Sequence, residues 1–117
     1  MKTYELMSIY GKNKKGYSGK AVVIEDENGN LFLQSYSTIV CAIAVSGKVV
    51  KFWDGYSTTT MQHINDFLLQ NGFSAISKKE WENIPVESCP IHPINSSYKV
   101  TYYWYPYKAL QGPYKAL

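Results

Sequence analysis

The residues that could do chemistry in this 117-residue chain are few, and they lie far apart in the sequence. His63 and Asp66 are three positions apart in a segment with helical periodicity, which would place a potential acid–base pair on one helix face. No nucleophile or third group occurs at a useful spacing, so we interpret His63 as a surface or packing residue. The sequence therefore predicts no catalytic residues, and we expect the protein not to be an enzyme.

A second candidate is Cys89-x-x-His92, which has half of the ligand spacing of a zinc site. Zinc would need two further ligands, and only Cys41 and His63 remain. Cys41 lies in an apolar strand-like run, where a small buried thiol is the ordinary interpretation. We therefore expect no metal, no cofactor and no disulfide.

A third candidate is the segment Gly11–Gly19, which is rich in glycine and lysine. It favours a solvated connection between strands, because it lacks the spacing and the following helix of a phosphate-binding loop. All twelve basic residues of the chain are Lys, so the side chain best suited to bidentate phosphate recognition is absent. The candidate binding residues in this loop are Lys12, Lys14, Lys15 and Tyr17.

The last candidate is the tyrosine-rich end of the chain. Tyr98–Tyr105 alternates like a β-strand, and PYKAL follows twice, without a physical explanation for the duplication. Three interpretations stay open: a last strand that covers the second face of a sheet over Ala42 and Ala44, an interface with a partner or a second copy of the chain, and base stacking on single-stranded nucleic acid. The candidate binding residues here are Tyr98, Tyr102, Trp104 and Tyr107.

The elements that would position these residues begin with a strand at Thr3–Tyr10 and two hairpins. Asn28-Gly29 between two strand-like runs predicts a two-residue type I′ turn, which puts Ile24 opposite Leu33. One apolar face would then contain Val22, Ile24, Leu31 and Leu33.

Ser46-Gly47 predicts a similar turn, with Ile43 opposite Val50. The face of this hairpin that points away from the core would carry Lys51 and small residues. We expect that face to be partly exposed or covered by another segment. The core face of this hairpin would contain Ile39, Cys41, Ile43, Val45, Val50 and Phe52.

Two helices follow. The main helix is predicted at about 58–71, with Ser57 or Thr59 as its N-cap and Asn71-Gly72 as a left-handed stop. A short second helix is predicted at about 78–84, where Ser77 and Glu80 have capping-box spacing. Ile76 and Trp81 would form its hydrophobic staple.

These elements predict an α+β fold, in which an antiparallel sheet of about five strands carries the main helix on one face and a short second helix. We divide the chain into a core domain at 1–84, a proline-rich connection at 85–97 and a tyrosine-rich strand or tail at 98–117 that packs on or extends the sheet. No apolar run is long enough to span a bilayer, and the N-terminus lacks the apolar core of a secretory signal. We therefore expect no membrane partner and a cytoplasmic location.

The segment Leu31–Phe73 resembles small uncharacterised proteins from phages and other mobile elements of low-GC Gram-positive bacteria. The resemblance rests on the patterns SYxTxV from Ser35 and YSxTT from Tyr56, then HI at His63, FL at Phe67 and QNGF at Gln70. It implies a small non-catalytic protein that binds a host protein, such as a defence protein, and inhibits it by occluding a surface. The alternatives are a nucleic-acid-binding module that uses the lysine-rich loop and the aromatic tail, and a sponge for a small nucleotide signal.

Overall fold

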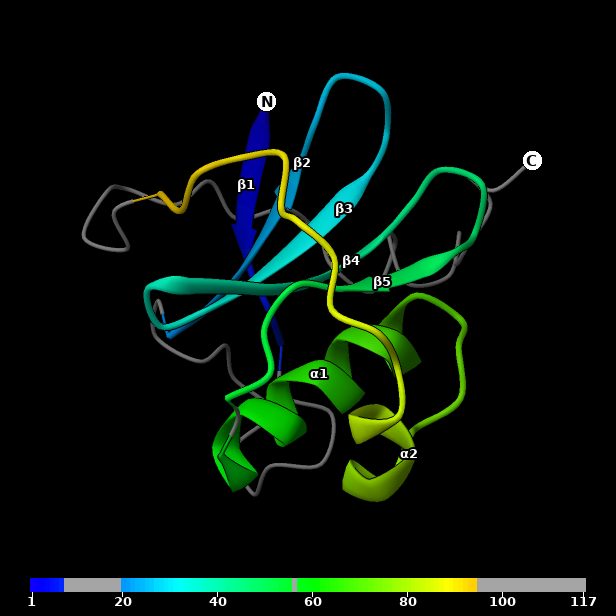
Figure 1. The fold of residues 1–117 in the computed structure, drawn as a ribbon. Helices are drawn as coiled ribbons and strands as arrows, with labels where there is room; N and C mark the ends of the chain where they lie inside the picture. Colours follow the sequence, from blue (N-terminus) through cyan, green and yellow to red (C-terminus); the bar gives the residue numbers. More distant parts are fainter. Residues whose placement is uncertain (8–19, 56, 95–117) are drawn as a thin grey trace.

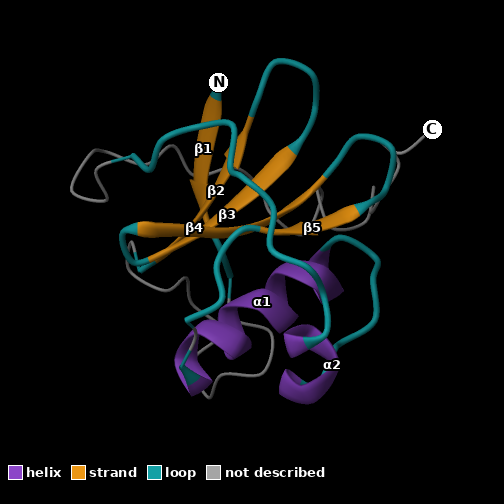
Figure 2. Cartoon of the chain, in the orientation of Figure 1, coloured by secondary structure: helices purple, strands orange, loops and turns teal. Residues whose placement is uncertain are grey.

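The computed structural model describes residues 1–7, 20–55 and 57–94. Within these residues, five strands form one antiparallel sheet in the order β1-β2-β3-β4-β5 (Figure 1). Both helices, α1 and α2, lie on the same face of the sheet (Figure 2). The predicted α+β fold is confirmed. The bounds are β1 Lys2–Glu5, β2 Ala21–Glu25, β3 Leu31–Ser35, β4 Thr38–Ile43, β5 Val49–Lys51, α1 Thr58–Gln70 and α2 Lys78–Glu82.

The hairpin between β2 and β3 has a three-residue loop where the sequence predicted two residues. The backbone N–H of Asp26 donates to the carbonyl of Asn30, and Gly29 takes the left-handed conformation at φ 92°. The carboxylate of Asp26 also accepts hydrogen bonds from the backbone N–H groups of Asn28 and Asn30. This loop has the features of a type I turn followed by a glycine bulge, so the predicted type I′ turn was wrong.

The hairpin between β4 and β5 repeats this arrangement. The N–H of Ala44 donates to the carbonyl of Lys48, and Gly47 is at φ 91°. The glycine therefore occupies the third loop position rather than the second. In both hairpins the extra loop residue shifts the pairing by one position.

A shift of one residue turns one strand of a pair over relative to its partner, so the predicted matching of faces was wrong. Leu31 and Leu33 share one face as predicted, and so do Cys41 and Ile43, but Val22, Ile24, Ile39 and Phe52 belong to the other face. Ile24 lies opposite Phe32, and Ile43 lies opposite Val49. A bulge in the β3–β4 pairing adds a further offset, because Gln34 pairs with Ile39 while Leu33 pairs with Cys41. The core between sheet and helices takes from β2, β3 and β4 the side chains Ala21, Val23, Leu31, Leu33, Val40, Cys41 and Ile43.

Helix α1 begins and ends as its sequence predicts. The side chain of Ser57 caps it by accepting from the N–H of Thr60. At the other end the N–H of Phe73 donates to the carbonyl of Leu68, with Gly72 at φ 84°, which is a Schellman ending.

Helix α2 has the predicted capping box between Ser77 and Glu80, although it ends at Glu82 rather than near 84. Trp81 is buried in the core, and Ile76 packs against the same core. The short helix is thereby attached to the sheet through its one large aromatic side chain.

The face of the sheet away from the helices, here the second face, is also buried. It is formed by Val22, Ile24, Phe32, Ile39 and Ala42. The connection after α2 crosses this face, drawn in yellow in Figure 1, and packs Cys89, Ile91 and Ile94 against it. None of the helices within the described residues has the length and apolar character needed to cross a membrane.

Candidate functional site

The turn between β3 and β4 has an unusual backbone. Ser35 pairs with Thr38, so Tyr36 and Ser37 form a two-residue loop. Tyr36 is at φ 57°, and it is the one non-glycine residue with positive φ among the described residues. Glycine or asparagine normally occupies such a position, because a side chain with a Cβ atom is strained there by about 1 to 2 kcal/mol. The backbone N–H of Tyr36 donates to the carbonyl of Lys20 at 2.7 Å, which helps to hold the turn.

A chain of buried polar side chains lies beneath this turn. Ser35 Oγ contacts His63 Nδ1 at 2.8 Å and Thr60 Oγ1 at 3.4 Å. Thr60 Oγ1 in turn lies 3.4 Å from the Oγ of Ser57, the cap of α1. Through these contacts the end of β3 is joined to the first two turns of α1.

His63 is neutral in this environment. Burial, with a further contribution from the positive charge of Lys20, lowers the pKa of His63 from 6.5 to about 4. A serine beside a neutral histidine is the beginning of a nucleophile–base pair, but both side chains are buried and closed to a substrate. Of the two roles expected for His63, surface or packing, the structure gives it the packing role, and its partner Ser35 is distant in the sequence.

The ring of Tyr36 lies over this buried pair and faces outward. Its centroid is 5.8 Å from that of His63, the rings are tilted by 42°, and 46% of the residue is exposed. The strained turn therefore presents a large aromatic side chain at the surface above a hydrogen-bonded support.

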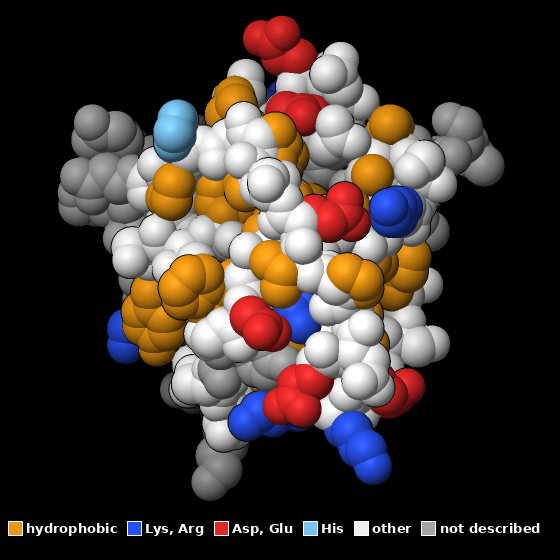
Figure 3. Space-filling model, in the orientation of Figure 1, with side chains coloured by type: hydrophobic (Ala, Val, Ile, Leu, Met, Phe, Trp, Pro, Cys, Tyr) orange, Lys and Arg blue, Asp and Glu red, His pale blue; other side chains and the backbone are white. Residues whose placement is uncertain are grey.

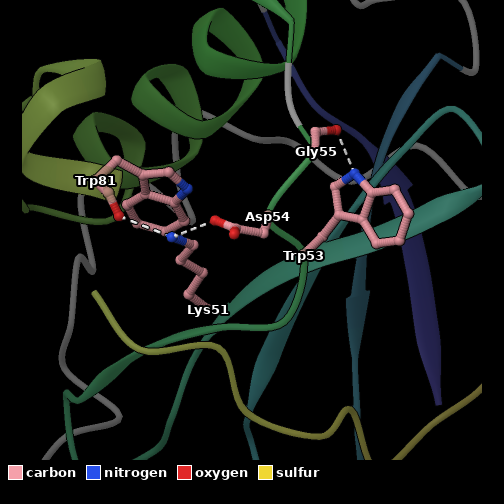
Figure 4. A network of polar contacts seen from close by, with 5 residues as sticks. All are labelled: Lys51, Trp53, Asp54, Gly55 and Trp81. Atoms are coloured by element: carbon pink, nitrogen blue, oxygen red, sulfur yellow. Dashed lines mark hydrogen bonds and ion pairs between the residues drawn. The ribbon is translucent and has the colours of Figure 1, made fainter. Parts of the chain in front are cut away.

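Trp53 lies at the same end of the sheet. The N–H of Phe52 donates to the carbonyl of Val40, so the pairing of β5 with β4 continues toward the turn that carries Tyr36. Trp53 is also 46% exposed, and its indole N–H donates to the carbonyl of Gly55 (Figure 4). Figure 3 shows hydrophobic side chains at the lower left of the molecule, over the end of the sheet where the β3–β4 turn lies. We call Tyr36 and Trp53 together the aromatic corner.

The loop beyond Trp53 is attached to α2 by a buried lysine. Lys51 Nζ donates to the carbonyl of Trp81 at 3.0 Å and forms an ion pair with Asp54 at 3.0 Å (Figure 4). The same nitrogen lies 6.0 Å from the centroid of the Trp81 ring. The expectation that Lys51 lies on the face opposite Cys41 and Ile43 was wrong, because the register shift turns this side chain toward the helices.

A polar cleft of about 660 Å³ adjoins this loop. Its acidic side chains, Asp54 and Glu82, outnumber the single lysine, and the start of α1 forms one wall. The residues that line it are Asp54, Gly55, Ser57, Lys78 and Glu82.

The candidate residues chosen from the sequence lie elsewhere. Lys12, Lys14, Lys15, Tyr17, Tyr98, Tyr102, Trp104 and Tyr107 are all outside the described residues. The aromatic corner was missed because no local pattern marks a strained turn. A usable signal was the two-residue gap between the strand-like runs at Leu31–Tyr36 and Ile39–Val45.

The cysteines and His92 have separate surroundings. Cys41 is buried in the sheet, where desolvation raises the pKa of its thiol, and both cysteines are free. Cys89 donates from Sγ to the carbonyl of Ile91 at 3.2 Å, while His92 is exposed. Within the described ranges, no three His, Cys, Asp or Glu side chains are grouped as metal ligands.

The residues behind the resemblance meet at this site. Ser35, Tyr36, Ser57, Thr60 and His63 belong to the quoted patterns, and all five take part in the turn or its support. No curated protein and no solved structure matches the chain. A family model described as a family of unknown function (DUF8033) matches residues 4–83, which run from β1 to α2. The chain therefore belongs to this family of unknown function.

Proposed function

We propose that this protein is a small non-catalytic binding protein that contacts another protein through the aromatic corner. The observation that carries the proposal is Tyr36, which is held in a strained conformation and half exposed over the Ser35–His63 contact. Backbone strain of this kind costs stability, and it persists where the surrounding structure enforces it, most often at functional sites.

The chemistry of the aromatic corner supports a protein partner. Tyrosine and tryptophan dominate the residues that contribute most to protein interfaces, because they bury a large area while losing few side-chain rotamers. The hydrogen bond from Trp53 to Gly55 fixes the indole before binding, which lowers the entropy cost of association. The adjoining cleft supplies carboxylates and a lysine for the polar rim that surrounds such contacts.

The resemblance supports a proposal for the origin and the target. We propose a phage or mobile-element origin in low-GC Gram-positive bacteria, a cytoplasmic location, and inhibition of a host protein, such as a defence protein, by occlusion of its surface. The tyrosine-rich strand could add a homodimer contact, and the lysine-rich loop with the tail could instead bind nucleic acid or a small nucleotide. The nucleic-acid and nucleotide alternatives become outcomes of the test below.

The test compares three forms of the full chain as immobilised bait in lysate from a low-GC Gram-positive host. The first is wild type, the second is Tyr36→Ser with Trp53→Ser, and the third is a matched control, Val45→Ser with Val86→Ser. The control also removes two exposed hydrophobic side chains, which are 38% and 49% exposed and are not part of the aromatic corner.

We expect a specific host protein to be retained by wild type and by the control, and lost from the corner variant. With the purified partner, affinity should fall at least about 30-fold in the corner variant, since a hot-spot residue contributes about 2 kcal/mol or more. Equal retention by all three forms would reject the aromatic corner as the contact. Retention that disappears after nuclease treatment or at moderate salt would favour the nucleic-acid alternative. A nucleotide released from the purified protein and identified by mass spectrometry would favour the sponge.

A further inference from the structure

The second face of the sheet contains an apolar groove beside the connection. Its volume is about 240 Å³, which is below the roughly 300 Å³ at which small-molecule pockets begin, so it suits side chains better than a ligand. The rings of Phe32 and Phe52 stack in its floor, with centroids 6.0 Å apart. The groove is lined by Asn30, Phe32, Ala42, Ala44, Val50, Phe52, Glu87, Ser88 and Pro90.

The described part of the chain ends on this same face. Ile94 packs against the second-face cluster, and its N–H donates to Gln34 Oε1 at 2.8 Å. Gln34 Nε2 donates back to the carbonyl of Ile94 at 2.8 Å. The Gln34 amide is buried and uses both its oxygen and its nitrogen on Ile94, so the last described residue is fixed on this face. The sequence has 23 further residues, 95–117.

We propose that residues 98–105 of the same chain occupy this groove and complete the second face. Phe32 lies two residues from Gln34, which is about 7 Å along β3. The four residues from Ile94 to Tyr98 can span up to about 14 Å, so the segment reaches the groove without help from a second copy.

The sequence of this segment complements the groove. Tyr98, Val100, Tyr102 and Trp104 alternate along one face of the predicted strand. Large aromatic side chains pack well against small ones, and Ala42 and Ala44 leave that space in the groove. From residue 98 onward the chain has three Lys and no acidic residue, whereas the groove wall carries the half-exposed carboxylate of Glu87, which already lies 3.6 Å from Lys48 Nζ. Charge therefore contributes little, and the fit depends on the apolar groove and the aromatic side chains.

The experiment measures trypsin cleavage after Lys99 in the full chain, with a synthetic peptide of residues 95–105 as the unprotected reference. The groove is filled by Ala44→Phe, and Val45→Phe adds the same side chain at the neighbouring exposed position as a control. A third variant, Tyr102→Ala with Trp104→Ala, removes the proposed occupant without touching the described core. Far-UV circular dichroism checks that each variant is folded.

We expect wild type and Val45→Phe to be cleaved at least about tenfold more slowly than the peptide, and both other variants to lose most of this protection. Protection should not change when the protein concentration is raised tenfold, because the contact is within one chain.

Cleavage of wild type at the peptide rate would overturn the proposal. Unchanged protection in Tyr102→Ala with Trp104→Ala would also overturn the proposal. This second test remains valid even if Ala44→Phe fails to fold. Protection that rises with concentration, together with a doubled mass in light scattering, would assign the occupant to a second copy. None of these outcomes depends on the aromatic corner, so the proposed function stands or falls separately.

Discussion

Acid should destabilise this protein through His63. The pKa of His63 is about 4 in the folded protein, because the ring is buried, and close to 6.5 when the chain unfolds. The unfolded state therefore binds more protons between these values, so stability is full above about pH 6.5 and falls as the pH is lowered toward 4.

The size of the effect follows from the two pKa values. Linkage gives a loss of about 2 kcal/mol between pH 7.5 and pH 5, and partial screening by solvent reduces the expected value to about 1 to 2 kcal/mol. This loss reflects the cost of charging a buried ring that also lies near the positive charge of Lys20.

The assay is urea denaturation of the full chain at both pH values, followed by tryptophan fluorescence. His63→Asn retains a polar atom near the position of Nδ1 for Ser35 but does not titrate, so its stability should be nearly the same at both pH values. His92→Asn is the matched control, since His92 is exposed and should leave the wild-type loss intact. An equal loss of stability in wild type and His63→Asn would refute the reasoning.

Three further predictions use the same denaturation measurement. Tyr36→Gly should be more stable than Tyr36→Ala by about 1 kcal/mol, because both remove the ring but only glycine relieves the positive φ; equal stability would mean that the turn is not strained. Asp54→Asn should cost about 1 to 2 kcal/mol by removing a charged partner of Lys51, and a loss that persists in a Lys51→Met background would contradict this account. Gly72→Ala should cost about 1 kcal/mol, since alanine is strained at φ 84°; no change would argue against the Schellman ending.

Local signals identified the elements because their causes are local. Ser57 caps α1 with its own side chain, and the capping box of α2 joins Ser77 to Glu80 only three residues away. Gly72 ends α1 because it adopts the left-handed conformation there, which would strain any residue with a Cβ atom. The resemblance was limited to Leu31–Phe73, and the match to a family of unknown function extends over residues 4–83. The functional proposals for the lysine-rich loop and the tyrosine-rich tail stay predictions.

The registers of the two hairpins could not be derived from the turn residues alone. Asn-Gly and Ser-Gly each fit a two-residue turn, but each also fits a three-residue loop with the glycine last, and the two choices place opposite faces in the core. In the first hairpin, the side chain of Asp26 accepts from two backbone N–H groups and so favours the longer loop. Lys51 was assigned to the wrong face for this reason, since a shift of one residue turns its side chain toward the helices, where it is buried.

By itself, the sequence determined the type, order and ends of most elements, because capping, glycine stops and alternation act over a few residues. The tertiary structure decided which residues form a site. Ser35 and His63 are 28 residues apart, and only the packing of α1 on the end of β3 brings them to 2.8 Å. The same packing supports Tyr36 in a strained turn, and the pairing of β5 with β4 places Trp53 at the same end of the sheet. No local pattern contains that arrangement, because its energy comes from contacts between distant segments.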